Sequence, residues 1–320
     1  MRPLERSTTR KRVLIVGGGG FLGAAYARRR IAAGEIVHVL VKPTTPLDRL
    51  RAVAGEIGVH RVRPGDQERL HAAFRESAPN VVIHAASRTR RPPSDDLSDA
   101  VLSVREDLEP LLAVLEAAAT TPRPPDLFLR LGSLAEYGFG SFAHGETDCE
   151  RPADAYAAGM LAGTRYMAML QPRLPFAAMT ARLGLVYGPG QSQRFFIPAA
   201  LHACLAGEPL HVRRPQDARD LIHVDDVLRG LDALSAAPSP GAVVNVGAGV
   251  AVPMGDVARL IMRLTGAPPS LLREGPGGPA RVLRLRNDLA ARRWGWRPRI
   301  SLEAGLTRML DALRAEAGVH

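Results

Sequence analysis

The sequence predicts an α/β protein with a doubly wound parallel sheet and a smaller C-terminal lobe. Three observations carry this prediction: short apolar runs alternate with helical segments through the first half of the chain, the first run passes directly into a glycine-rich turn, and the alternation weakens after residue 183. Apolar residues make up 46% and charged residues 23% of the 320 residues, which is typical of a globular protein rather than a disordered chain.

The alternating elements fill the first half of the chain. The helix at 24–33 is closed by Gly34, the strand at 36–41 is ended by Pro43, and the uninterrupted apolar run at 81–83 is typical of a strand buried inside a parallel sheet. In chain order we expect strands at 13–16, 36–41, 59–62, 81–83, 127–131 and 177–183, and helices at 24–33, 67–78, 98–119 and from about 155.

Loops rich in glycine and proline interrupt the second half of the chain, at 188–190, 236–241 and 266–279. They predict a second lobe that is assembled from separated segments. We therefore expect a first domain at 1–180, joined by 219–248. The smaller lobe, which would bind the substrate, is expected to consist of 181–218 and 249–320.

Charge, cysteine content and hydropathy exclude several classes of protein. The net charge is +10, but the arginines are scattered rather than interleaved with aromatic residues, which predicts a solvated basic surface and no nucleic-acid partner. Cys149 and Cys204 lie far apart and outside any metal-ligand spacing, so we expect neither a disulfide framework nor a metal site. Residues 1–12 lack the apolar segment of a signal peptide, and no later run is long enough to span a bilayer. We expect a short flexible leader, no membrane partner and a cytoplasmic protein.

The glycine-rich turn predicts a dinucleotide site in the first domain. Gly17, Gly20 and Gly23 lie between the first strand and the first helix, where they allow a tight turn, a close approach of the backbone to a diphosphate, and close packing of helix on strand. Lys42 follows the second strand, where NAD-specific proteins usually carry a carboxylate, so we favour NADP over NAD. The alternative is that Lys42 is an ordinary solvated lysine.

Ordered motifs along the chain resemble the extended short-chain dehydrogenase/reductases of the NAD-dependent epimerase/dehydratase group, which act on nucleotide sugars. The resemblance covers about residues 12–312 and implies a Rossmann fold for the first domain. The matching segments are Gly17–Gly23, Gly65-Asp66, Val82–Ala86, Arg182–Gly190, Arg219–Asp226, Asn245–Gly247 and Trp294–Pro298.

The resemblance also implies ligand contacts and a homodimer built from two helices per subunit. Arg219 matches the arginine that pairs with the nucleotide diphosphate, and the alternative for this side chain is a surface ion pair with Asp217 or Asp220. The implied cofactor contacts are Gly17, Gly20, Phe21, Leu22, Gly23, Lys42, Asp66, Ala85, Ala86, Tyr156 and Leu183. The implied substrate contacts are Ser133, Leu185, Arg219 and either Arg273 or Arg281.

Ser133 and Tyr156 match two of the three catalytic residues of this family, in which a lysine follows the tyrosine by four positions. Here that position holds Met160, whose thioether cannot supply the field of an ammonium group. Tyr156 should stay mostly a protonated phenol, which suits reduction of a carbonyl better than oxidation, since oxidation needs a base. Outside a catalytic site, Ser133 would be a strand-end cap and Tyr156 a core residue at a helix start. Three nearby side chains are candidates for the missing cation: Arg88, Arg90 and His144.

The residues after Ser133 bear on the reaction. Family dehydratases carry Thr-Asp-Glu where this chain has Ser133, Leu134 and Ala135, so the acid pair that eliminates water is missing. Leu185 also replaces an asparagine that contacts phosphate in many members. We expect an NADPH-dependent ketoreductase acting on a keto-deoxysugar nucleotide. The alternatives are a nucleotide-sugar epimerase of the same family and a catalytically degenerate NADP-binding protein.

His223, Asp225 and Asp226 resemble a metal-binding set only at first sight. Because the run has no further ligands, we expect it to be structural, with the aspartate capping the helix that follows.

Overall fold

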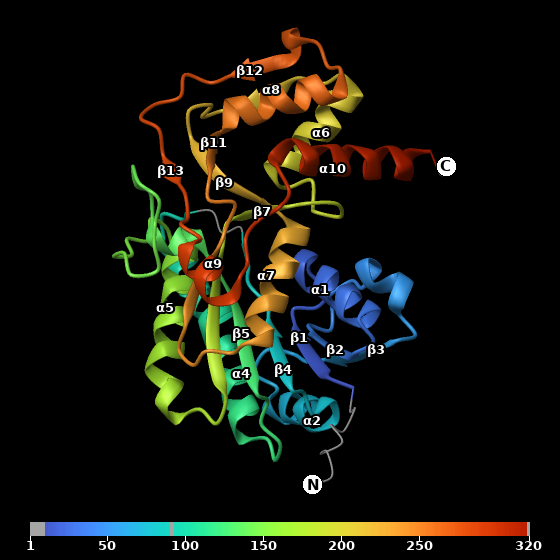
Figure 1. Ribbon diagram of the computed structural model, residues 1–320, viewed down its shortest axis with the longest axis vertical. Coiled ribbons are helices and arrows are strands. Elements are labelled where there is room, and N and C mark those ends of the chain that lie inside the picture. The colour runs from blue at the N-terminus through green and yellow to red at the C-terminus, as the bar shows by residue number, and fades with distance from the viewer. Residues whose placement is uncertain (1–9, 90–92, 319–320) are drawn as a thin grey trace.

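The computed structural model describes residues 10–89 and 93–318, and its centre is a parallel sheet of seven strands (Figure 1). The strand order is β10-β6-β5-β4-β1-β2-β3. The chain adds β2 and β3 on one side of β1, crosses back, and adds β4, β5, β6 and β10 on the other side. A crevice forms at the carboxyl ends of the strands where this reversal occurs, between β1 and β4. The strands are β1 (Arg12–Val16), β2 (Ile36–Val41), β3 (Ile57–Arg61), β4 (Val81–His84), β5 (Leu127–Ser133), β6 (Ala177–Leu183) and β10 (Val243–Val246).

Helices cover both faces of this sheet, which confirms the predicted doubly wound fold. Side chains alternate along each strand, so Val13 and Ile15 of β1 pack with one helical layer while Leu14 and Val16 pack with the other. The first layer contains α1 (Phe21–Ala32) and α7 (Val224–Ala236). The second contains α2 (Gln67–Ser77), α4 (Glu109–Thr120) and α5 (Ala155–Leu170).

The predicted elements match the structure closely, with small shifts at their ends and one division. The first helix begins at Phe21, three residues earlier than predicted. The third strand begins at Ile57, two residues earlier than predicted. The helix predicted at 98–119 is divided into α3 (Ser98–Ser103), a π-helical stretch η2 (Val104–Leu108) and α4. Pro110, in the first turn of α4, has no N–H to continue an α-helical ladder, which accounts for the change of pattern just before it.

The C-terminal lobe has an apolar core of its own, lying between short strands and helices beyond one end of the large sheet (Figure 1). Strand β9 pairs with β7, β11 and β13, and the chain then returns through α7 and β10 to the large sheet. The expected division into domains agrees with this path but stays a prediction. The elements of the lobe and its connections are β7 (Leu185–Tyr187), α6 (Phe196–Ala206), β8 (Leu210–Val212), β9 (Ala218–His223), β11 (Ala251–Pro253), α8 (Met254–Thr265), β12 (Leu272–Glu274), β13 (Val282–Leu283), α9 (Asp288–Trp294) and α10 (Leu302–Ala317). Short 3-10 turns lie at η1 (Asp48–Val53), η3 (Leu134–Tyr137), η4 (Gln171–Arg173) and η5 (Pro269–Leu271).

The cap of α7 differs from the prediction. His223, not an aspartate, is the N-cap: its Nδ1 accepts the Asp225 N–H at 3.2 Å. Asp226 is buried and instead accepts the backbone N–H groups of Arg299 and Ile300 at 3.0 and 2.9 Å. A buried carboxylate needs such donors, so Asp226 fastens α7 to the segment that precedes α10.

Further sequence expectations concern features outside the core. Within the described part of the chain, no set of three His, Cys, Asp or Glu side chains is arranged to hold a metal ion, and Cys149 and Cys204 are both free thiols. None of the helices in the described ranges is long and apolar enough to cross a bilayer. Most of the leader expected at 1–12 lies outside the described residues.

We predict that Phe128→Ala lowers the free energy of unfolding by about 3–5 kcal/mol. Phe128 is fully buried in β5 and stacks on Phe176 with ring centroids 6.1 Å apart, so truncation leaves a cavity. Urea unfolding followed by circular dichroism measures the change. Phe142→Ala, at a ring that is 57% exposed, is the control and should change stability by about 0.5 kcal/mol at most. Equal effects of the two substitutions would contradict the packing described for this face.

Candidate functional site

The glycine turn after β1 is pressed between the end of β4 and the start of α1. Gly17 has φ +81°, and a Cβ on it would lie 2.8 Å from the Ala86 amide nitrogen. A Cβ on Gly23 would lie only 2.4 Å from the Gly17 carbonyl oxygen. Both positions therefore require glycine. Gly17 requires it because of its positive φ and the clash that a Cβ would make, and Gly23 because of such a clash alone.

The N-terminus of α1 fits a diphosphate. Gly20 is the N-cap and has no side chain to occupy the free amides of the first turn, and that turn contains no acidic residue. The first amides of a helix have no acceptor within the helix and carry a partial positive charge. Since Gly20, Phe21 and Leu22 also line a cavity, these amides lie where an anionic group can reach them.

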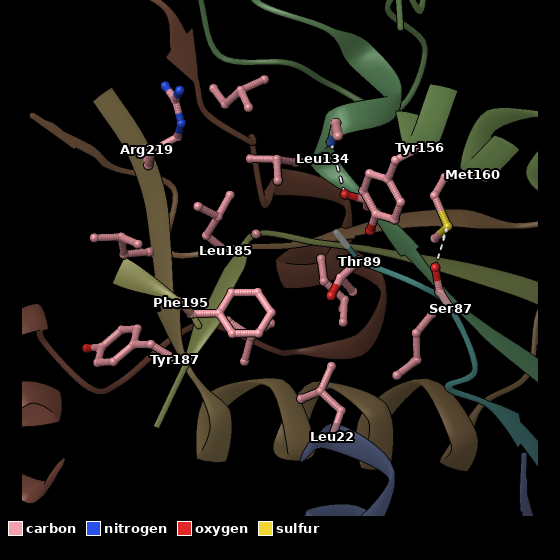
Figure 2. A pocket seen from close by; sticks show the side chains of 18 of the residues that line it. Leu22, Ser87, Thr89, Leu134, Tyr156, Met160, Leu185, Tyr187, Phe195 and Arg219 are labelled. Carbon is pink, nitrogen blue, oxygen red and sulfur yellow. Dashed lines mark hydrogen bonds between the residues drawn. The ribbon is translucent and has the colours of Figure 1, made fainter. Parts of the chain in front are cut away.

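That cavity, of about 630 Å³, lies at the carboxyl ends of the strands and extends to the C-terminal lobe (Figure 2). It brings together many of the residues predicted from sequence, namely Gly20, Phe21, Leu22, Ala85, Ser133, Tyr156, Met160, Leu183, Leu185 and Arg219. The other predicted contacts are not among its lining residues: Gly17, Gly23, Lys42, Asp66, Ala86 and the alternatives Arg273 and Arg281.

Ser133 ends β5 and Tyr156 lies in the first turn of α5, and both line the cavity. Ser133 is also the strand-end cap that the sequence offered as an alternative. Its Oγ accepts the Ala135 N–H at 3.2 Å, and its own N–H donates to Glu136 Oε1 at 2.9 Å. Asp154 caps α5 by accepting the Ala157 N–H at 2.8 Å. These two capped turns fix the backbone on which the serine and the tyrosine stand.

The phenol of Tyr156 is held in its protonated form. Burial raises the pKa of Tyr156, and hydrogen bonding with Ser133 opposes this shift only in part. A phenol in this state can donate a proton to an oxygen in the cavity at neutral pH, but it is a poor base there.

Met160, which lies one turn after Tyr156 on α5, contacts groups from two neighbouring parts of the sheet, the loop after β4 and β5 itself. Its Sδ accepts the Ser87 hydroxyl at 3.4 Å from the loop after β4, as Figure 2 shows. From β5, Arg130 Nη2 lies 3.6 Å from the same sulfur and donates to the Met160 carbonyl oxygen at 2.9 Å. A buried guanidinium therefore lies directly behind the side chain that replaces the family lysine.

The cations proposed from sequence are placed differently. Arg88 donates to Glu106 at 2.9 Å and is largely exposed. His144 stacks on Tyr137 with ring centroids 4.9 Å apart, and burial lowers the pKa of His144, which favours its neutral form. Arg90 lies outside the described residues. Sequence reasoning missed Arg130, although an arginine inside the apolar run 127–131 was a visible signal of a buried charge.

The predicted adenosine contacts lie at the ends of β2 and β3. Lys42 is exposed directly after β2. Asp66 follows β3 and caps α2 by accepting the Arg69 N–H at 3.1 Å. The cap uses one of its oxygens, and the carboxylate stays partly exposed on the same edge of the sheet as Lys42.

Two arginines flank an aromatic ring at the opposite end of the cavity. Arg219 and Arg281 each place the guanidinium carbon 5.4 Å from the centre of the Phe139 ring. Arg219 Nη2 also contacts Asp217 at 3.0 Å, so the ion pair foreseen as its alternative role is present. Arg219 still lines the cavity while it contacts Asp217 and the Phe139 ring, so its guanidinium can also bind a ligand there.

Apolar side chains form most of the wall between these two ends. Figure 2 shows Leu134, Leu185 and Phe195 around the space between Tyr156 and Arg219. The polar side chains of the lining are Arg49, Ser87, Thr89, Ser133, Asp154, Tyr156, Tyr187, Gln191, Ser192 and Arg219. A ligand in the middle of the cavity therefore meets hydrocarbon more often than hydrogen-bonding groups.

The parallel sheet, the glycine turn and the serine and tyrosine beside it define an NAD(P)-dependent enzyme of the extended short-chain dehydrogenase/reductase type. The chain belongs to the NAD-dependent epimerase/dehydratase family, whose model matches residues 13–247.

Individual relatives modify nucleotide sugars. The dTDP-6-deoxy-L-talose 4-dehydrogenase (NAD(P)(+)) of Kitasatospora kifunensis is 27% identical over 319 residues, which covers 95% of this chain and 96% of the relative. The dTDP-4-dehydro-6-deoxy-D-allose reductase of Streptomyces bikiniensis is 24% identical and covers 83% and 85%. The UDP-glucose 4-epimerase of Thermus thermophilus, solved with NAD, has a TM-score of 0.83 and 25% identity, covering 95% and 99%. The chain is thus a nucleotide-sugar-modifying enzyme that uses a nicotinamide cofactor.

We predict that Gly23→Ala weakens NADPH binding about tenfold or more, because the added Cβ would push the Gly17 carbonyl out of the turn. Isothermal titration calorimetry measures the dissociation constant. Gly55→Ala is the matched control, since a Cβ at Gly55 meets no described heavy atom within 4 Å, and it should bind like the unaltered protein. Unchanged binding by a folded Gly23→Ala variant would refute the assignment of this turn.

Proposed function

We propose that the protein is an NADPH-dependent ketoreductase that reduces the carbonyl group of a keto-deoxysugar nucleotide. The observation that carries this proposal is the state of Tyr156: its phenol lines the cavity with a raised pKa, and a methionine occupies the place of the lysine. Reduction needs a proton donor, which this phenol is, whereas oxidation needs the base that burial disfavours.

Two of the named relatives support a deoxysugar substrate. One is a dehydrogenase of a dTDP-6-deoxysugar and the other a reductase of a dTDP-4-dehydro-6-deoxysugar. The apolar wall made by Leu134, Leu185 and Phe195 agrees with this class, because a sugar that lacks hydroxyl groups loses fewer hydrogen bonds against hydrocarbon. Ala135 and Leu134 supply no acid and base for the elimination of water.

In the proposed reaction the protein binds both partners and moves one proton. The amides at the start of α1 would hold the cofactor diphosphate, and the reduced nicotinamide cofactor, when bound, would supply a hydride for the carbonyl carbon. Tyr156 gives its proton to the carbonyl oxygen, and the Ser133 hydroxyl donates a hydrogen bond to the same oxygen, so a ketone becomes an alcohol. Arg219, which lines the cavity, binds the substrate diphosphate, and Arg281 beside the same Phe139 ring adds positive charge there. The apolar wall excludes water from the reacting centre.

The proposal includes NADP as the cofactor and a homodimer as the assembly. Lys42 at the end of β2 supports NADP, because a cation there favours a 2′-phosphate. Val101 and Leu102 of α3 and Tyr166 and Met169 of α5 support the homodimer, since these apolar side chains are 36–56% exposed on two helices in contact.

One finding favours a second candidate, a nucleotide-sugar epimerase. A solved relative of high structural similarity is a UDP-glucose 4-epimerase with NAD bound. An epimerase returns its cofactor to the starting state, so purified protein would carry bound NAD and interconvert isomers without net oxidation of NADPH. A catalytically degenerate protein would bind NADP and turn nothing over.

We predict that the purified protein oxidises NADPH in the presence of 4-keto or 3-keto deoxysugar nucleotides, and that Tyr156→Phe lowers kcat about 100-fold or more. Loss of absorbance at 340 nm measures the rate. Tyr166→Phe, at an exposed tyrosine on the same helix, is the control and should leave kcat unchanged. The rate should stay level through neutral pH and fall only above the usual phenol pKa of about 10, because a raised pKa keeps the donor protonated. Absence of turnover on every ketone would refute the reductase.

We predict that Lys42→Glu lowers kcat/KM for NADPH about tenfold or more relative to NADH, because the carboxylate repels a 2′-phosphate and accepts ribose hydroxyls. Initial rates at varied cofactor concentration measure the ratio. Lys11→Glu, directly before β1 at the amino ends of the strands, provides the matched change of charge and should leave the ratio unaltered. An unchanged ratio for Lys42→Glu would exclude this lysine from cofactor selection.

A further inference from the structure

Arg130 is a charged residue in the interior of the large sheet. It lies in the middle of β5, is 4% exposed, and its place in the alternation of the strand directs it toward α5. The helix is shaped to receive it: a Cβ on Gly163 would lie 2.7 Å from Arg130 Nη2. The glycine thus leaves room for the guanidinium against the helix axis.

The guanidinium donates to groups of α5 that are electrically neutral. Nη1 donates to the Thr164 hydroxyl at 3.0 Å, and Nη2 donates to the Met160 carbonyl oxygen at 2.9 Å, with the Met160 sulfur at 3.6 Å. Thr164 passes the interaction on, since its hydroxyl donates to Glu136 Oε2 at 2.8 Å. Arg130 therefore keeps its charge close to the helix turn that carries Tyr156, without a carboxylate in direct contact along these bonds.

Such an arrangement is costly for stability. A buried guanidinium loses its hydration, and apolar residues that fill the same space often stabilise a protein more than a buried charge does. Phe128, the neighbour of Arg130 on the same face of β5, shows that this layer accepts large apolar side chains. A costly buried charge placed beside a candidate catalytic group points to a role in function.

We propose that the Arg130 guanidinium, held behind Met160, supplies the positive charge that stabilises the Tyr156 oxygen when this phenol gives up its proton. The inference rests on the proposed function for the identity of Tyr156 as the donor. The proton leaves Tyr156 Oη for the carbonyl oxygen of the substrate, the phenolate that remains is stabilised by Arg130, and solvent returns a proton after the product leaves. Arg130 acts through Tyr156 and touches no substrate, so it is a positioning residue.

The charges around Tyr156 agree with this role. Burial raises the pKa of Tyr156, Glu136 of η3 and Asp107 of η2 raise it further, and Arg130 opposes them. The coupling is mutual: burial lowers the pKa of Arg130, whereas Glu136, Tyr156 and Asp107 favour its charged form. Arg182 of β6 is the other cation that acts on Arg130, and its Nε is paired with Glu136 at 2.7 Å.

The position of Arg130 also explains why this chain has methionine and not lysine at position 160. An ammonium in the place of the Met160 side chain would lie against a guanidinium that is already 3.6 Å from the sulfur. Two buried cations at this separation repel each other. Arg130 and a lysine at position 160 are therefore alternative ways to place one positive charge beside the tyrosine.

The test is the titration of Tyr156 in the free protein, by NMR of tyrosine labelled with ¹³C at Cζ and assigned with Tyr156→Phe. We expect Arg130→Met to raise the pKa of Tyr156 by about 1 unit or more, a tenfold loss of phenolate at a given pH, and Arg130→Lys to keep most of the effect. Arg165→Met, at an exposed arginine of the same helix that pairs with Glu150, is the matched control and should change nothing. An unchanged Tyr156 titration in folded Arg130→Met would overturn the inference.

Met160→Lys provides a second measurement, which stays informative if Arg130→Met folds poorly. In the unaltered background it should lower the melting temperature and leave kcat no higher, whereas in the Arg130→Met background it should restore both folding and the Tyr156 titration. If Met160→Lys has the same effect in both backgrounds, Arg130 does not fill the lysine's role and the inference fails. The titration needs no substrate, so a shift in the absence of any turnover would reject the ketoreductase and leave the electrostatic coupling established.

Discussion

The geometry of the candidate site depends on one buried carboxylate, Glu136. Oε1 accepts the Ser133 N–H, and Oε2 accepts both the Thr164 hydroxyl and the Arg182 guanidinium, so a single side chain joins the end of β5 to α5 and to β6. Glu136 has no exposed surface. Removing it would leave the buried Arg182 with only its ion pair to Glu150, and the loss of a buried partner costs at most about 3–5 kcal/mol. The serine and the tyrosine therefore keep their relative positions as long as this carboxylate is satisfied.

The parts of the molecule that could be predicted from the sequence are those whose causes are local. Apolar runs, the proline at 43 and the glycine at 34 each act within a few residues, and the strands they predicted begin within two residues of the observed ones. Gly17 and Gly23 were predictable for the same reason, since both belong to one turn. The division of the helix before α4 was not anticipated, because the helical pattern runs through Pro110 and gives no local sign of the π-helical stretch that precedes it.

The features that were not predicted depend on contacts between distant segments. The role proposed for Arg130 depends on its contacts with Met160, Gly163 and Thr164. These residues follow it by 30 residues or more and contact it only when α5 packs on the sheet. An aspartate of the pair Asp225 and Asp226 was expected to cap the helix, but Asp226 accepts backbone N–H groups from a segment more than 70 residues later as well as the Arg229 side chain of its own helix. A strand position of unexpected charge was visible in the sequence, whereas its partners became apparent only in three dimensions.

Gly163 illustrates how one buried charge restricts a residue that performs no chemistry. Its missing side chain is the space that the guanidinium fills, so even a methyl group would strike the nitrogen that donates to the Met160 carbonyl. Positions 130 and 163 therefore share one space. In related chains, alanine or a larger residue at position 163 should occur where position 130 is no longer arginine. During evolution the two residues would have to change together or in a fixed order, with glycine at position 163 appearing before arginine at position 130.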